Sequence, residues 1–260
     1  MSETKSLFAF FDEIAAAAAA ATLPYFRTVM SIDNKLVGGF DPVTEADKGA
    51  ERAIRAIIER EYPEDGIHGE EYGLVRENAA RRWVIDPVDG TRAFISGLPT
   101  WGTLVGLTEN NVAIAGMMAQ PFTGETFMAD GKRAVRQSHG QIADLRVSAC
   151  KNLNDAKMFT TSPHLFKGQM RERFDALERH VKMSRYGTDC YAFAMLAAGF
   201  ADIVIDPGLQ PYDIVALIAL IEQAGGIVTT LDGNRAENGG DIIAAATPDL
   251  HKAAMERMRG

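Results

Sequence analysis

The segment 82–91, which reads RWVIDPVDGT, places two carboxylates next to a point where the chain is expected to turn. An apolar strand-like run ends in Asp86, Pro87 disfavours its continuation, and Asp89 follows three residues after Asp86. With the Val88 carbonyl between them, the two carboxylates offer three hard oxygen ligands within four residues. This spacing predicts a site for hard divalent cations such as Mg²⁺.

Two interpretations of the next residues stay open at this point. If Gly90 and Thr91 open a short helix, their amide N–H groups point at whatever anion the metals hold. Alternatively, the segment is an ordinary Pro/Asp/Gly turn, in which the aspartates accept hydrogen bonds from their own backbone.

Two more acidic residues could join this site. Glu70 lies in the acidic segment 68–71, which we expect to form a loop, although a solvated charge is the alternative. Asp213 stands at the start of a helix expected over 212–224, where the helix dipole alone would favour an aspartate. Because residues 214–221 are apolar on every side, that helix should be buried, and Asp213 then needs a partner such as a metal.

The local patterns also predict the elements that carry these residues. Thr44 and Asp47 fit a capping box, with Thr44 as the N-cap of a helix. Strands expected to form an antiparallel meander follow Trp83, at residues 103–108, 112–120 and 125–129. Short strands that alternate with helices then occupy residues 157–161, 181–186, 202–205, 227–230 and 242–246.

This change of pattern predicts two halves in one compact α/β unit. Residues 1–150 should form an α+β half that carries most metal ligands, and residues 151–260 an α/β half that carries Asp213 and the residues for substrate specificity. The soft boundary lies near 146–156, without a flexible linker.

Composition excludes several classes of protein. The 260 residues are 47% hydrophobic and 24% charged, as in globular proteins, and the net charge of −8 without a basic block argues against a nucleic-acid partner. Cys150 and Cys190 lack the spacing of a zinc site or a disulfide framework. The apolar run 14–21 is too short to span a membrane, and acidic residues precede it, unlike in a signal peptide. We therefore expect a cytoplasmic protein with no membrane partner.

Several motifs occur in the order known from one family. The motifs are GEE at 69–71, DPVDGT at 86–91, and YD at 212–213 followed by GG at 225–226, while VTEAD at 43–47 matches the family's Val-Thr-x-x-Asp element. The sequence thus resembles the magnesium-dependent, lithium-sensitive phosphatases of the inositol monophosphatase family, over nearly the whole chain. The resemblance implies a layered α/β/α/β/α sandwich, often found as a homodimer.

The resemblance also implies roles for individual residues. Two or three Mg²⁺ ions would be held by Glu70, Asp86, the Val88 carbonyl, Asp89 and Asp213. Asp47 would lie beside the nucleophilic water, which Glu70 together with Thr91 or Asp47 would orient and deprotonate. The metals would clamp the phosphate of a monoester and activate the water for direct attack, which also explains how an acidic protein binds an anionic ester. We find no candidate Ser, Cys or His nucleophile beside a base, and therefore do not expect a covalent phosphoenzyme.

Within the family, the chain looks most like the histidinol-phosphatase branch. The residues that indicate this are Arg92 and the segments 94–102, 160–163 and 187–191. The inositol branch usually has a small neutral residue where Asp189 stands, and a carboxylate suits the cationic histidinol phosphate. The alternative for Asp189 is an N-cap of the helix that follows it.

The remaining substrate contacts are expected around the phosphate and the leaving group. Gly90, Thr91 and Arg92 would contact the phosphate, although Arg92 could instead pair with a surface acid. Asp206 precedes Asp213 by seven residues, the spacing of the family's substrate-hydroxyl glutamate, but it is a shorter carboxylate.

We therefore expect a small phosphorylated substrate, and histidinol phosphate of histidine biosynthesis in particular. A first alternative is inositol 1-phosphate or another sugar or polyol phosphate. A second, from another class, is a non-catalytic metal- or ligand-binding relative, whose expected mark would be the loss of a metal ligand. All five ligand positions are present here.

Overall fold

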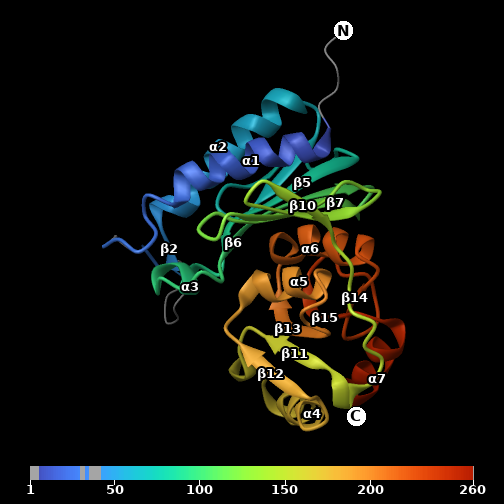
Figure 1. Cartoon of the computed structure of the whole chain (residues 1–260). Helices are drawn as coiled ribbons and strands as arrows, with labels where there is room; N and C mark the ends of the chain where they lie inside the picture. The colour runs from blue at the N-terminus through green and yellow to red at the C-terminus, as the bar shows by residue number, and fades with distance from the viewer. Residues whose placement is uncertain (1–5, 30–32, 35–41, 260) are drawn as a thin grey trace.

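The computed structural model describes residues 6–29, 33–34 and 42–259. Its layers follow one another from top to bottom of Figure 1 as helices, sheet, helices, sheet and helices. The α/β/α/β/α sandwich expected from the sequence is thus confirmed.

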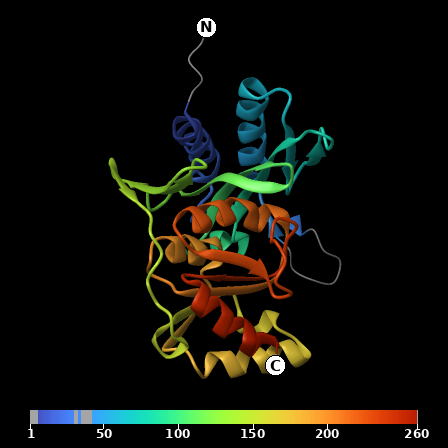
Figure 2. The same ribbon diagram turned by 90° about the vertical axis from the view of Figure 1, so that its right-hand side faces the viewer.

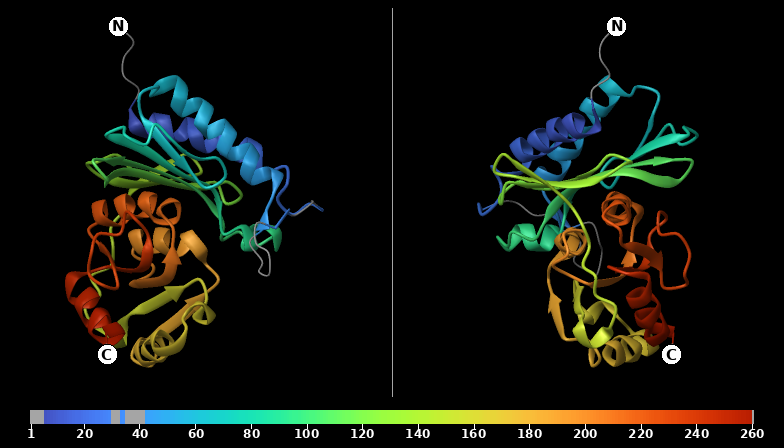
Figure 3. Two further views of the ribbon diagram at one scale, coloured as in Figure 1. Left: turned by 180° about the vertical axis from the view of Figure 1, so that it is seen from behind. Right: turned by 45° about the vertical axis from the view of Figure 1, so that its right-hand side comes forward.

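The first layer consists of two helices, α1 (Leu7–Thr22) and α2 (Glu45–Glu61), which lie along the outer face of the first sheet (Figure 3). The predicted capping box begins α2: the Ala46 N–H donates to Thr44 Oγ1, and the Thr44 N–H donates to Asp47 Oδ2 over 2.8 Å. This cap anchors Asp47 at the end of the helix nearest the predicted site.

The first sheet has eight strands in the order β10-β9-β8-β7-β6-β5-β3-β4. Their bounds are β3 Gly66–Gly69, β4 Gly73–Val75, β5 Arg81–Asp89, β6 Gly102–Glu109, β7 Val112–Gln120, β8 Glu125–Ala129, β9 Ala134–Ser138 and β10 Gln141–Asp144. Strands β5 to β10 form an antiparallel meander, which extends the predicted one, and β3 pairs with β5 in parallel. A separate short pair is formed by β1 (Asp33–Asn34) and β2 (Pro42–Val43).

Two predictions about this sheet are wrong. Strand β5 does not end at Asp86 but continues through Pro87 to Asp89, because the pairing with β6 shifts register between Asp86 and Asp89 and so tolerates a residue without an N–H. His68 and Gly69 belong to β3 rather than to a loop. Such a short segment with two glycines becomes a strand through its pairing with β4 and β5.

The middle layer consists of α5 (Asp189–Ala197) and α6 (Pro211–Gln223), while the short α3 (Thr91–Ile95) lies at the end of the first sheet. The eight residues 214–221 of α6 are buried, as predicted. The helix backbone lies against two paired glycines of the sheet, Gly106 and Gly116. This close approach brings the first turn of α6 towards the end of β5.

The second sheet has the order β12-β11-β13-β15-β14, and α4 (Gly168–Glu178) and α7 (Pro248–Arg259) cover its outer face. Its strands are β11 Lys157–Thr160, β12 Met183–Tyr186, β13 Ile203–Leu209, β14 Ile227–Thr230 and β15 Gly240–Ala245. The chain passes from β10 to this sheet along one side of the molecule (Figure 2), in the region of the predicted boundary near 146–156. The division into halves at residues 150 and 151 stays a prediction.

Within the described part of the chain, the helices are all too short or too polar to cross a membrane.

Gly116→Ala should destabilise the protein, because a Cβ at this position would lie 2.3 Å from the Ala216 carbonyl oxygen of α6. Overpacking of this kind costs about 1–3 kcal/mol of unfolding free energy, which urea denaturation measures. The control is Gly49→Ala at a half-buried position of α2, where the nearest neighbouring atom, an Arg52 nitrogen, would lie 3.9 Å from the Cβ and helix propensity favours alanine. Equal stability of the two variants would contradict the close contact between α6 and the sheet.

Candidate active site

Three aspartates from two layers converge at the end of the first sheet. Asp86 and Asp89 flank the register shift in β5, and Asp213 lies in the first turn of α6. One carboxylate oxygen from each lies within 4.8 Å of the others, so this group could hold a metal ion. Carboxylate oxygens, together with the neighbouring Val88 carbonyl, form the donor set that hard divalent cations bind.

Backbone N–H groups orient each of these aspartates. The Val88 N–H donates to Asp86 Oδ1 over 3.0 Å, and the Gln210 N–H donates to Asp213 Oδ2 over 2.7 Å. Asp86 therefore accepts a bond from its own backbone, as the turn interpretation expected, although it lies within β5, and Asp213 lies in the first turn of α6 as expected. A carboxylate has two oxygens with several lone pairs, so capping the backbone does not preclude metal binding.

Two further carboxylates lie close to Asp86. Burial raises the pKa of Asp86 well above its usual value, and the negative charges of Glu70, Asp89, Asp213 and Asp47 raise it further. Glu70 directly follows β3, and its N–H donates to the Ile85 carbonyl over 3.1 Å. A divalent cation among these groups would reverse the shift by favouring the ionised carboxylates.

Thr91 connects the two sides of the cluster. Its hydroxyl donates towards the Val88 carbonyl at 3.1 Å and Asp47 Oδ1 at 3.4 Å. It is also the first residue of α3, which confirms that Gly90 and Thr91 open a helix. Gly90 has φ = 80°, and a Cβ at that position would lie 3.1 Å from the Asp189 Cβ, so both backbone and packing require glycine.

A cavity of about 140 Å³ adjoins the cluster. Its lining comprises Asp89, Asp213, Thr161, Leu165, Asp189, Cys190, Phe193, Asp206 and Leu209. The cavity thus combines two of the clustered aspartates with two further carboxylates and an apolar surface.

Asp189 is not the N-cap of α5, and that alternative from the sequence is wrong. It is the first residue of the helix, with φ = 42°, whereas Thr188 occupies the N-cap position without a side-chain bond. The Cys190 N–H of the first turn donates instead to Asp89 Oδ2 over 2.8 Å. Burial raises the pKa of Asp189 to about 6, and the positive charge of the exposed Arg92 opposes this shift. The charge of Arg92 therefore favours the ionised form of a carboxyl group that lines the cavity.

Asp206 at the end of the buried part of β13 is held by two threonines. Its Oδ1 accepts from Thr160 Oγ1 over 2.8 Å and from the Thr161 N–H over 2.7 Å, and its Oδ2 accepts from Thr161 Oγ1 over 3.1 Å. Burial raises the pKa of Asp206 to about 7, although these hydrogen bonds favour the ionised form. The shorter carboxylate is thus fixed in place at the cavity wall.

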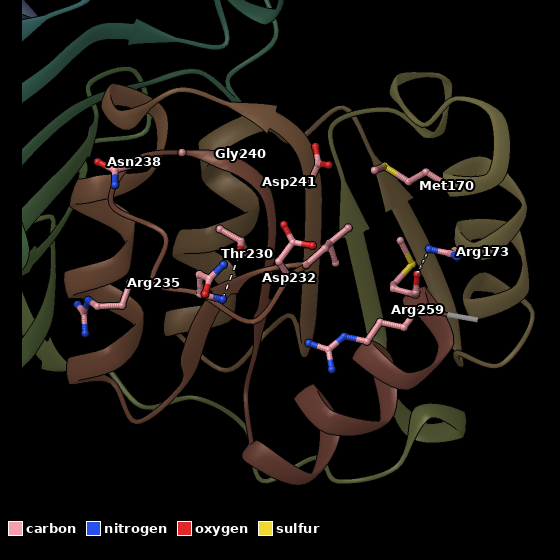
Figure 4. Close-up of a pocket in the computed structure, with 13 residues that line it drawn as sticks. Met170, Arg173, Thr230, Asp232, Arg235, Asn238, Gly240, Asp241 and Arg259 are labelled. Carbon is pink, nitrogen blue, oxygen red and sulfur yellow. Dashed lines mark hydrogen bonds between the residues drawn. The ribbon is translucent and has the colours of Figure 1, made fainter.

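A second cavity, of about 640 Å³, lies between β14, the start of β15, α4 and α7 (Figure 4). Two of its arginines already have partners: Arg235 pairs with Glu237, and Arg173 donates to the Met258 carbonyl. None of the predicted site residues lines it. The cluster beside the smaller cavity is therefore the candidate active site.

Sequence reasoning missed several residues of this region. Glu51 is fully buried behind the segment that carries Glu70, and its position four residues after Asp47, on the same face of a helix, was a usable signal. The apolar lining from Phe193 and Leu209 had no local signal, because those residues also match ordinary core positions.

Comparison with known proteins shows the family of this chain. The family model described as "Inositol monophosphatase family" matches residues 3–259. A bifunctional phosphatase, IMPL2, from Arabidopsis thaliana is 38% identical over 90% of this chain and 69% of its own length. A histidinol-phosphatase from Streptomyces coelicolor is 35% identical over 92% of this chain and 91% of its own.

Among solved structures, an inositol monophosphatase from Zymomonas mobilis superposes with a TM-score of 0.85 at 37% identity and covers 96% of both chains. The chain therefore belongs to the inositol monophosphatase family and is a phosphatase, that is, a phosphoric monoester hydrolase.

Proposed function

We propose that this chain is a Mg²⁺-dependent histidinol-phosphatase. The observation that supports this substrate is the cavity beside the acidic cluster, where the carboxylates of half-buried Asp189 and buried Asp206 share the lining with Leu165, Phe193 and Leu209. Histidinol phosphate brings an ammonium group, which pairs with a carboxylate, and an imidazole ring, which packs on apolar side chains. The likeness to the Streptomyces histidinol-phosphatase supports the same substrate.

The donor set of the acidic cluster fits Mg²⁺, which binds hard oxygen ligands. We assign two or three Mg²⁺ ions to Glu70, Asp86, the Val88 carbonyl, Asp89 and Asp213, since three of these carboxylates already lie within 4.8 Å of one another. When bound, Mg²⁺ supplies Lewis-acid stabilisation to the phosphate and to the leaving alkoxide.

The protein's own groups would orient the attacking water. The Thr91 hydroxyl donates its proton towards Val88 and Asp47, so its oxygen is left to accept a hydrogen bond from water. Asp47 or Glu70 then takes the proton of that water as general base. The amides of Gly90 and Thr91 hold the phosphate, while Arg92 keeps Asp189 ionised for the substrate ammonium group.

A second candidate substrate is inositol 1-phosphate. It is favoured by the likeness to the Zymomonas inositol monophosphatase and by Asp206, whose fixed carboxylate could accept a bond from a substrate hydroxyl. Phosphate release from histidinol phosphate and inositol 1-phosphate, measured side by side with Mg²⁺, tests the proposal. Faster turnover of inositol 1-phosphate would contradict it. The homodimer and the cytoplasmic location expected from the sequence stay predictions.

Asp213→Asn should abolish most activity, and a chelator should do the same to the unchanged protein. Asparagine can still cap the start of α6 but contributes no negative charge to a cluster that binds cations through summed charge. Phosphate release over a Mg²⁺ series measures the effect. Asp249→Asn, in the exposed first turn of α7, is the matched control and should leave activity unchanged. Full turnover in chelator would contradict a metal-dependent reaction.

Thr91→Ala should lower kcat by about 10²–10⁴-fold and change KM little, because a group that aligns the attacking water acts mainly in the transition state. Steady-state kinetics measure both constants. Thr91→Ser retains the hydroxyl and should recover most of the rate. If Thr91 only stabilised the turn, Thr91→Ala would lower the melting temperature and leave kcat intact.

Asp189→Asn should selectively impair hydrolysis of histidinol phosphate. An amide cannot form an ion pair with the substrate ammonium group, whereas asparagine tolerates the positive φ of this position. The measured quantity is the ratio of kcat/KM for histidinol phosphate to kcat/KM for glycerol phosphate, which lacks an amine. We expect the ratio to fall tenfold or more, equivalent to about 1.4 kcal/mol. An unchanged ratio would remove the main support for histidinol phosphate.

A further inference from the structure

Helix α2 buries a second carboxylate one turn after Asp47. Glu51 is fully buried, Asp47 is nearly so, and the i, i+4 spacing places both on the same face of the helix. A charge in such a position is destabilising unless hydrogen bonds and an opposite charge compensate its desolvation. The contacts of Glu51 therefore indicate what the residue is for.

Both oxygens of Glu51 contact the segment that carries Glu70. Oε2 accepts from the Glu71 N–H over 2.7 Å, and Oε1 accepts from the Tyr72 N–H over 3.2 Å. Arg55, on the next turn of α2, supplies the opposite charge by donating from Nε to Oε1 over 2.7 Å. The Glu51 carboxylate therefore lies against the turn between β3 and β4, and both of its oxygens accept hydrogen bonds there.

The packing around Gly69 explains why this turn begins with glycine. A Cβ on Gly69 would lie 1.9 Å from Glu51 Oε1 and 2.4 Å from its Cδ. Any side chain at this position would displace the carboxylate from the two amides. The first residue of the GEE motif is therefore required by the buried glutamate of α2.

Glu70 is fixed on both sides as a result. Its own N–H donates to Ile85, the residue before Asp86, and the next two N–H groups donate to Glu51. Two more bonds join α2 to the same turn, from Arg55 to the Gly73 carbonyl and from Arg52 to the Tyr72 hydroxyl. One helix therefore sets the positions of two groups in the active site, Asp47 at its first turn and Glu70 through the turn it holds.

We infer that Glu51 is a positioning residue for the reaction, which holds the Glu70 carboxylate in reach of Asp86 and so of the metal ions. The inference rests on the proposed role of Glu70 as a metal ligand. Groups that orient metal ligands without touching the metal typically contribute about 10–100-fold to metal affinity or activity. Glu51 has no contact with the substrate cavity.

The test uses Glu51→Gln, which keeps the size of the side chain but turns one acceptor oxygen into an NH₂ group that faces an N–H donor. We expect Mg²⁺ affinity, measured by titration calorimetry without substrate, and kcat with glycerol phosphate each to fall about 10–100-fold. Glu59→Gln, an exposed position on the same helix, should change neither. Wild-type Mg²⁺ affinity and kcat in Glu51→Gln would overturn the inference, even if its melting temperature falls.

Three additional variants separate the possible failures. If Glu70→Gln binds Mg²⁺ like the wild type, the proposed role of Glu70 has failed; if Glu70→Gln loses affinity and Glu51→Gln does not, only the inference about Glu51 has failed. Because Glu51 acts through Glu70, the double variant should bind Mg²⁺ no more weakly than Glu70→Gln alone.

If Glu51→Gln does not fold, Glu51→Asp keeps the charge beside Arg55 but cannot span both amides. It should show an intermediate loss of Mg²⁺ affinity, and wild-type affinity there would overturn the inference.

Discussion

The mutual repulsion of clustered carboxylates is the constraint on which this structure depends. Two unit charges at the separation found among Asp86, Asp89 and Asp213 repel each other by about 3–4 kcal/mol at an effective dielectric constant of about 20. Each aspartate accepts a hydrogen bond from a different backbone segment, within β5, in the first turn of α5 and before the first turn of α6. The backbone of two layers therefore holds together groups that would otherwise move apart, and this arrangement is pre-organised for divalent cations.

The packing of the middle layer determines whether the third aspartate can reach the other two. Helix α6 approaches the first sheet at Gly106 and Gly116, where side chains would collide with its backbone. With residues 214–221 buried, the helix has no freedom to withdraw towards solvent. The site is thus linked to the core, since the same contact that buries apolar surface also places Asp213.

The proposed roles in substrate selection and catalysis are divided between the layers. The first sheet and α2 supply most groups of the carboxylate cluster, whereas α5, β13 and the segment after β11 supply much of the cavity that would hold the leaving group. Asp189 connects the two parts, since it packs against Gly90 and the positive charge of Arg92 lowers its pKa. A change of substrate within the family can therefore occur in the second part without disturbing the first.

The sequence by itself determined the features that depend on neighbours along the chain. The capping box at Thr44, the antiparallel meander and the buried helix after Asp213 each follow from local periodicity or turn chemistry, and the structure contains them. For Gly90 and Thr91 the sequence left a helix and a turn open, and the structure contains the helix. The motifs also carried the family resemblance, which the family match confirms.

Only the tertiary structure decided the features that depend on partners distant in sequence. Pro87 continues a strand because β6 shifts register beside it, and His68 belongs to a strand because β4 and β5 flank it. Asp189 is the first residue of α5 rather than its cap, and the Cys190 N–H that follows it donates to Asp89, a hundred residues earlier in the chain. The role of Glu51 was hidden for the same reason: a buried charge is explained by the groups that compensate it, and these come from another element of the fold.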